Sequence, residues 1–149
     1  VTDSVHNHHN YAWRETHNGR DLWVVRKGAT PAFPGQRGFV GGSMGDDAVI
    51  IEGIDSAEAK ASLYSTVHGA GRLFGRNEAK RRFTKGAMDA WLRERGVTLI
   101  GADLDESPMA YRRLPDVLAE HAGSVKVLHT LRPFVVVMAG AGEFDPWKD

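Results

Sequence analysis

The first residues whose types and spacing suggest chemistry are histidines near the start of the chain. His6, His8 and His9 lie within four positions of one another. Imidazole is the commonest metal ligand among protein side chains, and it changes charge close to neutral pH. On a strand His6 and His8 would share one face, whereas on a helix His6 and His9 would do so. The spacing therefore predicts that one or two of these rings bind the same metal. The alternative is surface histidines that only form hydrogen bonds.

Another histidine ends a β-prone run. In Thr66-Val67-His68 the ring is followed at once by Gly69-Ala70-Gly71-Arg72, and Arg76 comes four residues after Arg72. Small residues would let a phosphate approach the ring of His68, and the planar fork of an arginine grips two phosphate oxygens at once. The segment predicts a phosphate site at His68. The alternative is a partly buried histidine packed at a turn.

Two other segments have residues that could hold an anion. The glycines of Gly41-Gly42-Ser43-Met44-Gly45 would let backbone N–H groups turn toward an anion, with the Ser43 hydroxyl as a further donor. A tight loop without a ligand is the alternative. A basic run could follow an RNA backbone beside His68, although such runs are usually solvated helix faces. It comprises Arg72, Arg76, Lys80, Arg81, Arg82 and Lys85.

Downstream of the basic run, the carboxylates of Asp105 and Glu106 could serve as acids or metal ligands. A turn closed by Pro108 is the simpler interpretation of this segment. Tyr111 could stack on a nucleic-acid base, although a tyrosine is more often part of the core.

The elements that must position these residues are predicted to be short strands and a few helices. Asn18-Gly19 predicts a hairpin turn between strands at 11–15 and 22–25. An apolar stripe predicts a helix over 78–95, which Asn77 caps and Gly96 ends. Further strands are expected at 48–51, 64–67, 97–100, 125–128 and 134–137, a short helix at 115–120 and a long loop at 27–45. The predicted fold class is α+β.

Composition limits the possible functions. The 149 residues suffice for one domain, and the formal net charge is zero, so any RNA contact must come from a local basic patch. The absence of cysteine excludes disulfides and thiolate metal sites within this segment. No apolar run is long enough for a membrane span, and we expect a cytoplasmic protein. The chain begins at Val1 and reaches its histidines within ten residues, so we expect it to be part of a longer protein.

Five segments occur together in an order that resembles the successive motifs of the RtcB family of RNA ligases. They are His-His-Asn-Tyr at 8–11, Arg-Lys-Gly-Ala-Thr at 26–30, Gly-Ser-Met-Gly at 42–45, His-Gly-Ala-Gly-Arg at 68–72 and Asp-Glu-Ser-Pro-Met-Ala-Tyr at 105–111. The resemblance runs from about Asn7 to Gly140, and the block that begins at His68 is quite specific.

The resemblance implies a manganese- and GTP-dependent enzyme that joins RNA ends, tRNA among them, through a GMP-histidine intermediate. It implies that His68 is guanylylated, that His9 is a manganese ligand and that Asn10 contacts GMP. The implied nucleotide-contacting residues are Gly41, Gly42, Ser43, Met44, Gly69, Ala70, Gly71, Arg72 and Tyr111. Lys27 and Arg76, with Arg72, would favour phosphate or RNA ends. The complete site would hold two Mn²⁺ ions.

The resemblance also implies that residues 1–149 are the C-terminal segment of a larger catalytic domain, with a loose tail at 143–149. Four positions depart from the family pattern: Ala48 and Gly75 stand where serine is usual, Val67 where cysteine is common, and Met138 where a lysine binds nucleotide. The family's other metal ligands lie upstream, so we expect the segment alone to be inactive. The rival hypotheses are a paralogue that only binds RNA or nucleotide, and a metal-dependent phosphoesterase that uses the His6–His9 cluster.

Overall fold

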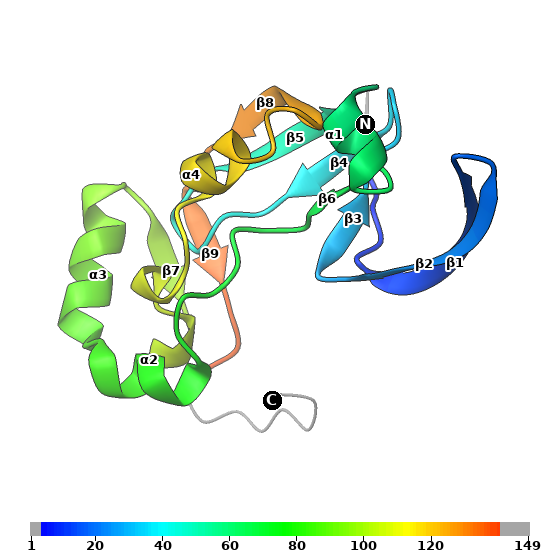
Figure 1. The fold of residues 1–149 in the computed structure, drawn as a ribbon. Coiled ribbons are helices and arrows are strands. Elements are labelled where there is room, and N and C mark those ends of the chain that lie inside the picture. The colour runs from blue at the N-terminus through cyan, green and yellow to red at the C-terminus, as the bar shows by residue number, and fades with distance from the viewer. Residues whose placement is uncertain (1–3, 141–149) are drawn as a thin grey trace.

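The computed structural model describes residues 4–140, and it mixes short strands with short helices, which confirms the α+β prediction. Within these residues the strands form three two-stranded sheets and one three-stranded sheet. Figure 1 shows the chain folding from a projecting hairpin, through a central group of strands, to a helical end. The predicted tail at 143–149 lies outside the described residues.

A hairpin of strands β1 (Asn10–His17) and β2 (Arg20–Lys27) opens the fold. The backbone φ angles of Asn18 and Gly19 are 51° and 72°, the two positive values that a type I′ turn requires. The predicted hairpin is therefore confirmed, with strands longer than expected. Its inner face buries Val24 and Arg26, whereas Val25 on the outer face is 72% exposed.

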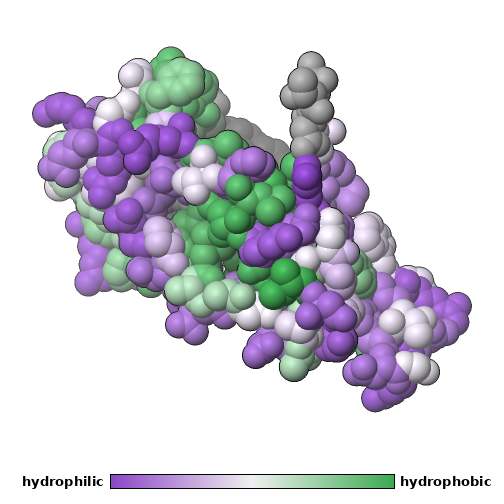
Figure 2. Space-filling model, turned by 90° about the horizontal axis from the view of Figure 1, so that it is seen from above, coloured by the Kyte–Doolittle hydropathy of each residue, from purple (hydrophilic) through white to green (hydrophobic). Residues whose placement is uncertain are grey.

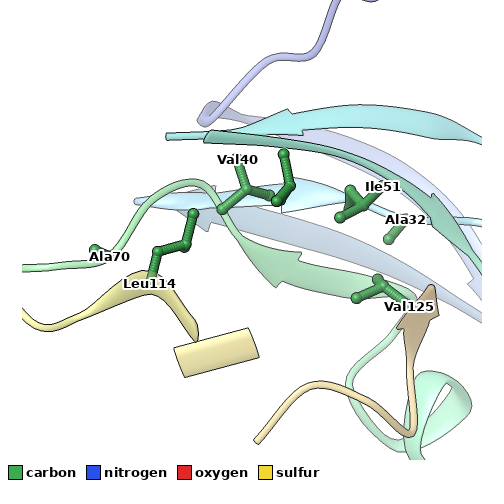
Figure 3. Packing of buried hydrophobic residues seen from close by; sticks show 7 residues of the cluster. Ala32, Val40, Ile51, Ala70, Leu114 and Val125 are labelled. Carbon is green, nitrogen blue, oxygen red and sulfur yellow. The ribbon is translucent and has the colours of Figure 1, made fainter. Parts of the chain in front are cut away.

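The central strands carry the larger hydrophobic core. Strand β3 (Ala29–Pro31) pairs with β6 (Ser65–Val67), and β5 (Ala48–Gly53) lies between β4 (Arg37–Val40) and β8 (Val125–Leu131). The side chains that meet between them, drawn in Figure 3, are Ala32, Val40, Val49, Ile51, Ala70, Leu114 and Val125.

The expected long loop at 27–45 is partly wrong, because it contains β3 and β4. Thr30 and Val40 are fully buried within it. Buried backbone N–H and C=O groups need partners, and pairing with β6 and β5 provides them.

The predicted helix over 78–95 is two helices, α2 (Arg76–Arg82) and α3 (Lys85–Glu94). Phe83 and Thr84 between them have extended backbones, and the Thr84 hydroxyl accepts a hydrogen bond from the Ala87 N–H at 3.2 Å. Thr84 thus caps a new helix. The expected cap at Asn77 is wrong, since the residue that precedes α2 is Gly75. Gly96 follows α3 with a φ of 69°, as predicted.

The remaining elements are short. Strands β7 (Thr98–Ile100) and β9 (Val135–Val137) pair in parallel, and α4 (Leu114–Ala119) lies near its predicted place. The short helix α1 (Ala57–Ala61) was not expected, and the 3-10 turns η1 (Leu104–Glu106) and η2 (Pro108–Ala110) replace the single turn expected near Pro108. A second core joins Met44 to α3 residues.

The surface is mixed in character. Seen from above in Figure 2, hydrophobic side chains gather in the middle of one face with hydrophilic ones around them. Strand β8 exposes Val127 and Leu131, which are 48% and 45% accessible. None of the helices in the described part of the chain is long and apolar enough to cross a membrane.

Candidate functional site

His68 directly follows β6, and the pairing of β6 with β3 decides what lies beside its ring. Ala29 opposes Val67 in the antiparallel register, so Gly28 comes next to His68. A Cβ atom on Gly28 would lie 3.5 Å from two ring atoms of His68, and the φ of Gly28 is +70°. Glycine adopts this backbone without strain and keeps that side of the ring open. His68 itself is exposed.

His9 lies over the same ring from the start of the hairpin. The N–H of Gly28 donates to the His9 carbonyl at 2.9 Å and to Asn10 Oδ1 at 3.3 Å, which fixes the chain just before β1. The rings of His9 and His68 then stack, with centroids 4.9 Å apart and planes 13° from parallel. The amide oxygen of Asn10 is therefore used inside the protein.

The other two histidines of the cluster lie together. The Nε2 atoms of His6 and His8 are 3.4 Å apart, and their rings meet edge to face. The cluster thus divides into a His6–His8 pair and a His9–His68 stack, which agrees with the expectation that the three rings do not act on one ion. That any of them binds metal stays a prediction.

The environment of His68 favours the neutral imidazole. Burial lowers the pKa of His68 from its ordinary value of 6.5, and the neighbouring His9 lowers this pKa further. Both effects disfavour a positive charge on the ring. An unprotonated ring nitrogen keeps the lone pair that a nucleophile needs.

A cavity of about 650 Å³ opens beside His68. This volume is in the usual range for a pocket that holds a small ligand. The cavity is lined by His68, Gly28 and the glycine-rich segment 69–71, together with Tyr111 and residues of α4. The structure thus brings five of the predicted site residues to one cavity: His68, Gly69, Ala70, Gly71 and Tyr111.

The loop at 41–44 lies against the same segment. The Gly41 N–H donates to the His68 carbonyl at 3.4 Å, and the Gly41 carbonyl accepts from the Ala70 N–H at 3.0 Å. The side chains of Ser43 and Met44 are buried, however, and Met44 belongs to the second core. Gly42 has a structural reason to be glycine, because a Cβ there would lie 2.5 Å from the Asp47 carbonyl oxygen.

Arg72 is held by groups of the protein itself. It donates to the Tyr111 hydroxyl at 2.7 Å and to the Phe74 carbonyl at 3.0 Å, and its guanidinium lies 4.8 Å from the centre of the Tyr111 ring. Burial and the hydrogen bond to Glu106 raise the pKa of Tyr111 to about 12, so its hydroxyl stays protonated. Tyr111 lines the cavity, and its hydroxyl accepts a hydrogen bond from Arg72 and donates one to Glu106.

Two residues of the basic run, Arg76 and Lys80, are paired with acidic side chains. Arg76 contacts Asp105 at 3.0 Å and also Glu106, and Lys80 contacts Asp103 at 2.6 Å. The acidic residues come from η1 and the residue before it, and η1 packs against α2. Opposite charges at this distance cancel much of the field that would attract an RNA backbone. Asp105 and Glu106 accordingly act as partners of arginines in this structure.

Two arginines that sequence reasoning did not single out line the cavity instead. Arg112 and Arg113 follow Tyr111 directly and lie at its edge. Arg113 donates to both carboxylate oxygens of Asp46, at 2.7 and 2.9 Å. The sequence feature that could have identified these two arginines is their position directly after Tyr111. Arg72 and Arg76 are not among the residues that line the cavity.

Comparison with known proteins decides the family. The model of the family described as tRNA-splicing ligase RtcB matches residues 1–139. The chain belongs to the RtcB family. The RNA-splicing ligase RtcB of Escherichia coli K12 is 37% identical over 138 residues, covering 91% of this chain and 32% of the relative. The tRNA-splicing ligases RtcB of Thermococcus kodakarensis and Pyrococcus horikoshii are each 32% identical over 86% of this chain, and the match covers 31% and 17% of their lengths. The chain thus spans about a third or less of these relatives.

The family motifs therefore meet in space in this RtcB-family chain. Segments around His9, Gly28, Gly41 and His68 are separated by many residues in the sequence, yet hydrogen bonds and ring stacking join them. In the part of the chain that the structure describes, no group of three or more histidine, aspartate or glutamate side chains could hold a metal ion. His9 offers one exposed imidazole beside His68.

The positions that depart from the family pattern have packing or capping roles here. Val67 packs against the larger core, and Met138 packs against the second core. Gly75 precedes α2 as its N-cap without a side-chain hydrogen bond, and Ala48 begins β5.

Proposed function

We propose that this chain carries the nucleotidyl-transfer centre of a GTP- and manganese-dependent RNA ligase, with His68 as the residue that becomes guanylylated. The observation that carries the proposal is the ring of His68 itself. It lies at a cavity of about 650 Å³, stacks on His9 and has a lowered pKa. These are the properties of an imidazole that is accessible, oriented and uncharged.

The proposed first step forms a bond between a ring nitrogen of His68 and the α-phosphorus of GTP. The bond to the β-phosphate oxygen breaks, and pyrophosphate leaves. The protein's part is mainly to position the reacting groups. Stacking on His9 restrains the ring, and Gly28 leaves space for the phosphorus on the backbone side.

The second stage transfers GMP from His68 to an RNA 3′-phosphate, which forms by opening of a 2′,3′-cyclic phosphate. A 5′-hydroxyl end then displaces GMP and joins the strands. The names of the relatives, RNA-splicing and tRNA-splicing ligases, support RNA as the substrate class, with tRNA among the candidates.

The metal requirement rests on charge and on the donor set. One cation about 4 Å from a phosphate oxygen contributes roughly 4 kcal/mol at an effective dielectric constant of 20. Arg113 at the cavity edge is already paired with Asp46, so the arginines alone do not balance a triphosphate. The imidazole of His9 fits one position of a manganese site, and the described residues do not supply the rest. Bound manganese would supply positive charge beside the phosphates.

The test is to incubate the full-length protein with α-labelled GTP and Mn²⁺ and to look for an acid-labile, alkali-stable protein adduct. We expect the adduct in the wild type and its loss in His68→Ala, because the attacking nitrogen is gone. His129→Ala removes an exposed histidine of β8 and is the matched control, which should label normally.

Each of the other outcomes contradicts the proposal or supports one of the rival hypotheses. Full labelling of His68→Ala contradicts the assignment of the nucleophile. Phosphate release from cyclic or monoester ends without GTP and without an adduct indicates a phosphoesterase. Salt-dependent RNA binding with neither reaction indicates a binding paralogue.

A further inference from the structure

Arg26 is the most completely bonded buried charge in the described structure. Its side chain is 1% exposed, although it carries a guanidinium group. An arginine has five N–H donors, and here all are used: Glu15 accepts two of them, and Tyr11 Oη, Ser65 Oγ and the Leu63 carbonyl accept one each. Burying a charge is costly unless it is paired and hydrogen-bonded in this way. An apolar residue would need none of these partners at this position.

The partners of Arg26 belong to two separate parts of the fold. Tyr11 and Glu15 lie on β1, the strand that pairs with β2, which carries Arg26. Ser65 is the first residue of β6, and Leu63 precedes it. The guanidinium therefore joins the hairpin to β6, the strand that His68 directly follows. The Ser65 bond from Nε is 2.9 Å long, as is the bond to the Leu63 carbonyl.

Burial alone would raise the pKa of Glu15, but hydrogen bonds from Arg26 and His17 outweigh it and lower this pKa below its ordinary value. Glu15 thus stays ionised at neutral pH. The ion pair keeps a fixed orientation because the carboxylate accepts from both terminal nitrogens of the guanidinium.

Besides Arg26, the hairpin and the segment before it are held at other places: Asn7 exchanges hydrogen bonds with the Phe39 backbone, and the Gly28 N–H donates to the His9 carbonyl. Figure 1 shows β1 and β2 projecting to one side of the remaining strands. At the turn end, the ring of His17 lies 6.2 Å from that of Phe33 and 6.0 Å from that of Tyr64. These ring contacts are less directional than the planar fork of Arg26. Arg26 thus fixes the inner face of the hairpin against β6, through its hydrogen bonds to Ser65 and to the Leu63 carbonyl.

That orientation, together with the Gly28 hydrogen bond to the His9 carbonyl, sets where His9 lies. His9 immediately precedes β1, and its ring stacks on the ring of His68. His68 is the other ring of the stack, and Ser65, to which Arg26 donates a hydrogen bond, lies three residues before it in the sequence. A tilt of the hairpin relative to β6 would therefore separate the two rings.

We propose that Arg26 is a positioning residue that locks the β1–β2 hairpin onto β6 and thereby keeps His9 over His68. That these two histidines act in one reaction rests on the proposed function. The claim about their placement rests only on the contacts of Arg26.

The test measures the hairpin's position directly with two nitroxide labels and pulsed electron spin resonance. The chain has no cysteine, so labels attach only where cysteines are introduced. Val25→Cys places one label on the exposed face of β2, and Ala119→Cys places the other at the exposed end of α4. The full-length protein is used, with any cysteines outside residues 1–149 replaced by serine.

Arg26→Met alone would leave Glu15 buried without its partner, and such a variant can simply fail to fold. The double variant Arg26→Met/Glu15→Leu removes both charges and keeps the site apolar. We expect it to fold, as circular dichroism will show, and the distribution of distances between the labels to become at least twice as wide.

Met88→Ala is the control, because it opens the second core without contacting the hairpin. It should lower stability and leave the distance distribution unchanged. A wild-type distribution in the double variant overturns the proposal, as does an equal broadening in Met88→Ala. Broadening in the double variant alone supports it, whether or not His68 forms a GMP adduct, so this result is independent of the labelling test.

Discussion

Gly28 shows, at the scale of single residues, that the site depends on a position with no side chain. Its φ is +70°, and a Cβ there would lie 3.5 Å from the His68 ring. A resemblance to a motif can mark this glycine, but the reason for it is visible only when β3 and β6 are paired.

Gly28→Ala should therefore lower both stability and the accessibility of His68. A left-handed backbone costs a non-glycine residue roughly 1–2 kcal/mol, and the added methyl group would contact the ring. Urea unfolding measures the first effect, and the rate of ring modification by diethyl pyrocarbonate, followed at His68 by mass spectrometry, measures the second.

Gly19→Ala is the matched control for Gly28→Ala. Gly19 has a φ of +72°, but no atom lies within 4 Å of the position that its Cβ would take. We expect a similar loss of stability and no change in the modification rate of His68. Equal modification rates in both variants would show that Gly28 does not control access to the ring.

The charges around Arg76 show what sequence reasoning could not provide at this scale. A run of basic residues is recognisable from spacing alone, and a cationic strip was a reasonable hypothesis. Its acidic partners, Asp103, Asp105 and Glu106, come from η1 and the residue before it, more than twenty positions away from the arginine and lysine that they contact. Only the tertiary fold reveals that Arg76 and Lys80 have these partners.

At the scale of elements, local signals were reliable and distant pairing was not. Asn18-Gly19 predicted the hairpin because a type I′ turn needs just these residue types. The strands β3 and β4 were missed because each is short and gains its partners from β6 and β5. The break between α2 and α3 was missed because the apolar stripe continues through it, while Thr84 supplies a capping hydroxyl in the middle.

The two helix starts give a matched prediction. Thr84→Ala removes the hydroxyl that accepts from the Ala87 N–H, and loss of such a cap costs about 1 kcal/mol. Asn77→Ala should cost much less, because Asn77 lies inside α2 and does not cap it. Chemical unfolding of both variants measures the difference. A larger loss in Asn77→Ala would contradict the observed helix boundaries.

At the scale of the whole molecule, the candidate site is assembled from segments that are distant in sequence. The resemblance predicted which segments matter, and the fold brings His9, Gly41 and His68 into contact through Gly28 and Ala70. The chain nevertheless spans about a third or less of its relatives.

The proposed manganese requirement predicts that residues 1–149 alone form no GMP adduct, even at high Mn²⁺ concentration. The described residues offer His9 but no group of three ligands. The full-length protein under the same conditions should be labelled by α-labelled GTP. Equal labelling of the isolated chain would show that residues outside it are not needed for the transfer.

The decisive question is which atom of the protein takes the nucleotide. Full-length protein incubated with GTP and Mn²⁺ can be digested at alkaline pH, which preserves a phosphorus–nitrogen bond, and its peptides mapped by mass spectrometry. We expect GMP on the peptide that contains residues 66–72, with fragment ions that assign it to His68. GMP attached to any other residue, or an unmodified His68 in protein that joins RNA, would contradict a histidine nucleophile at this position.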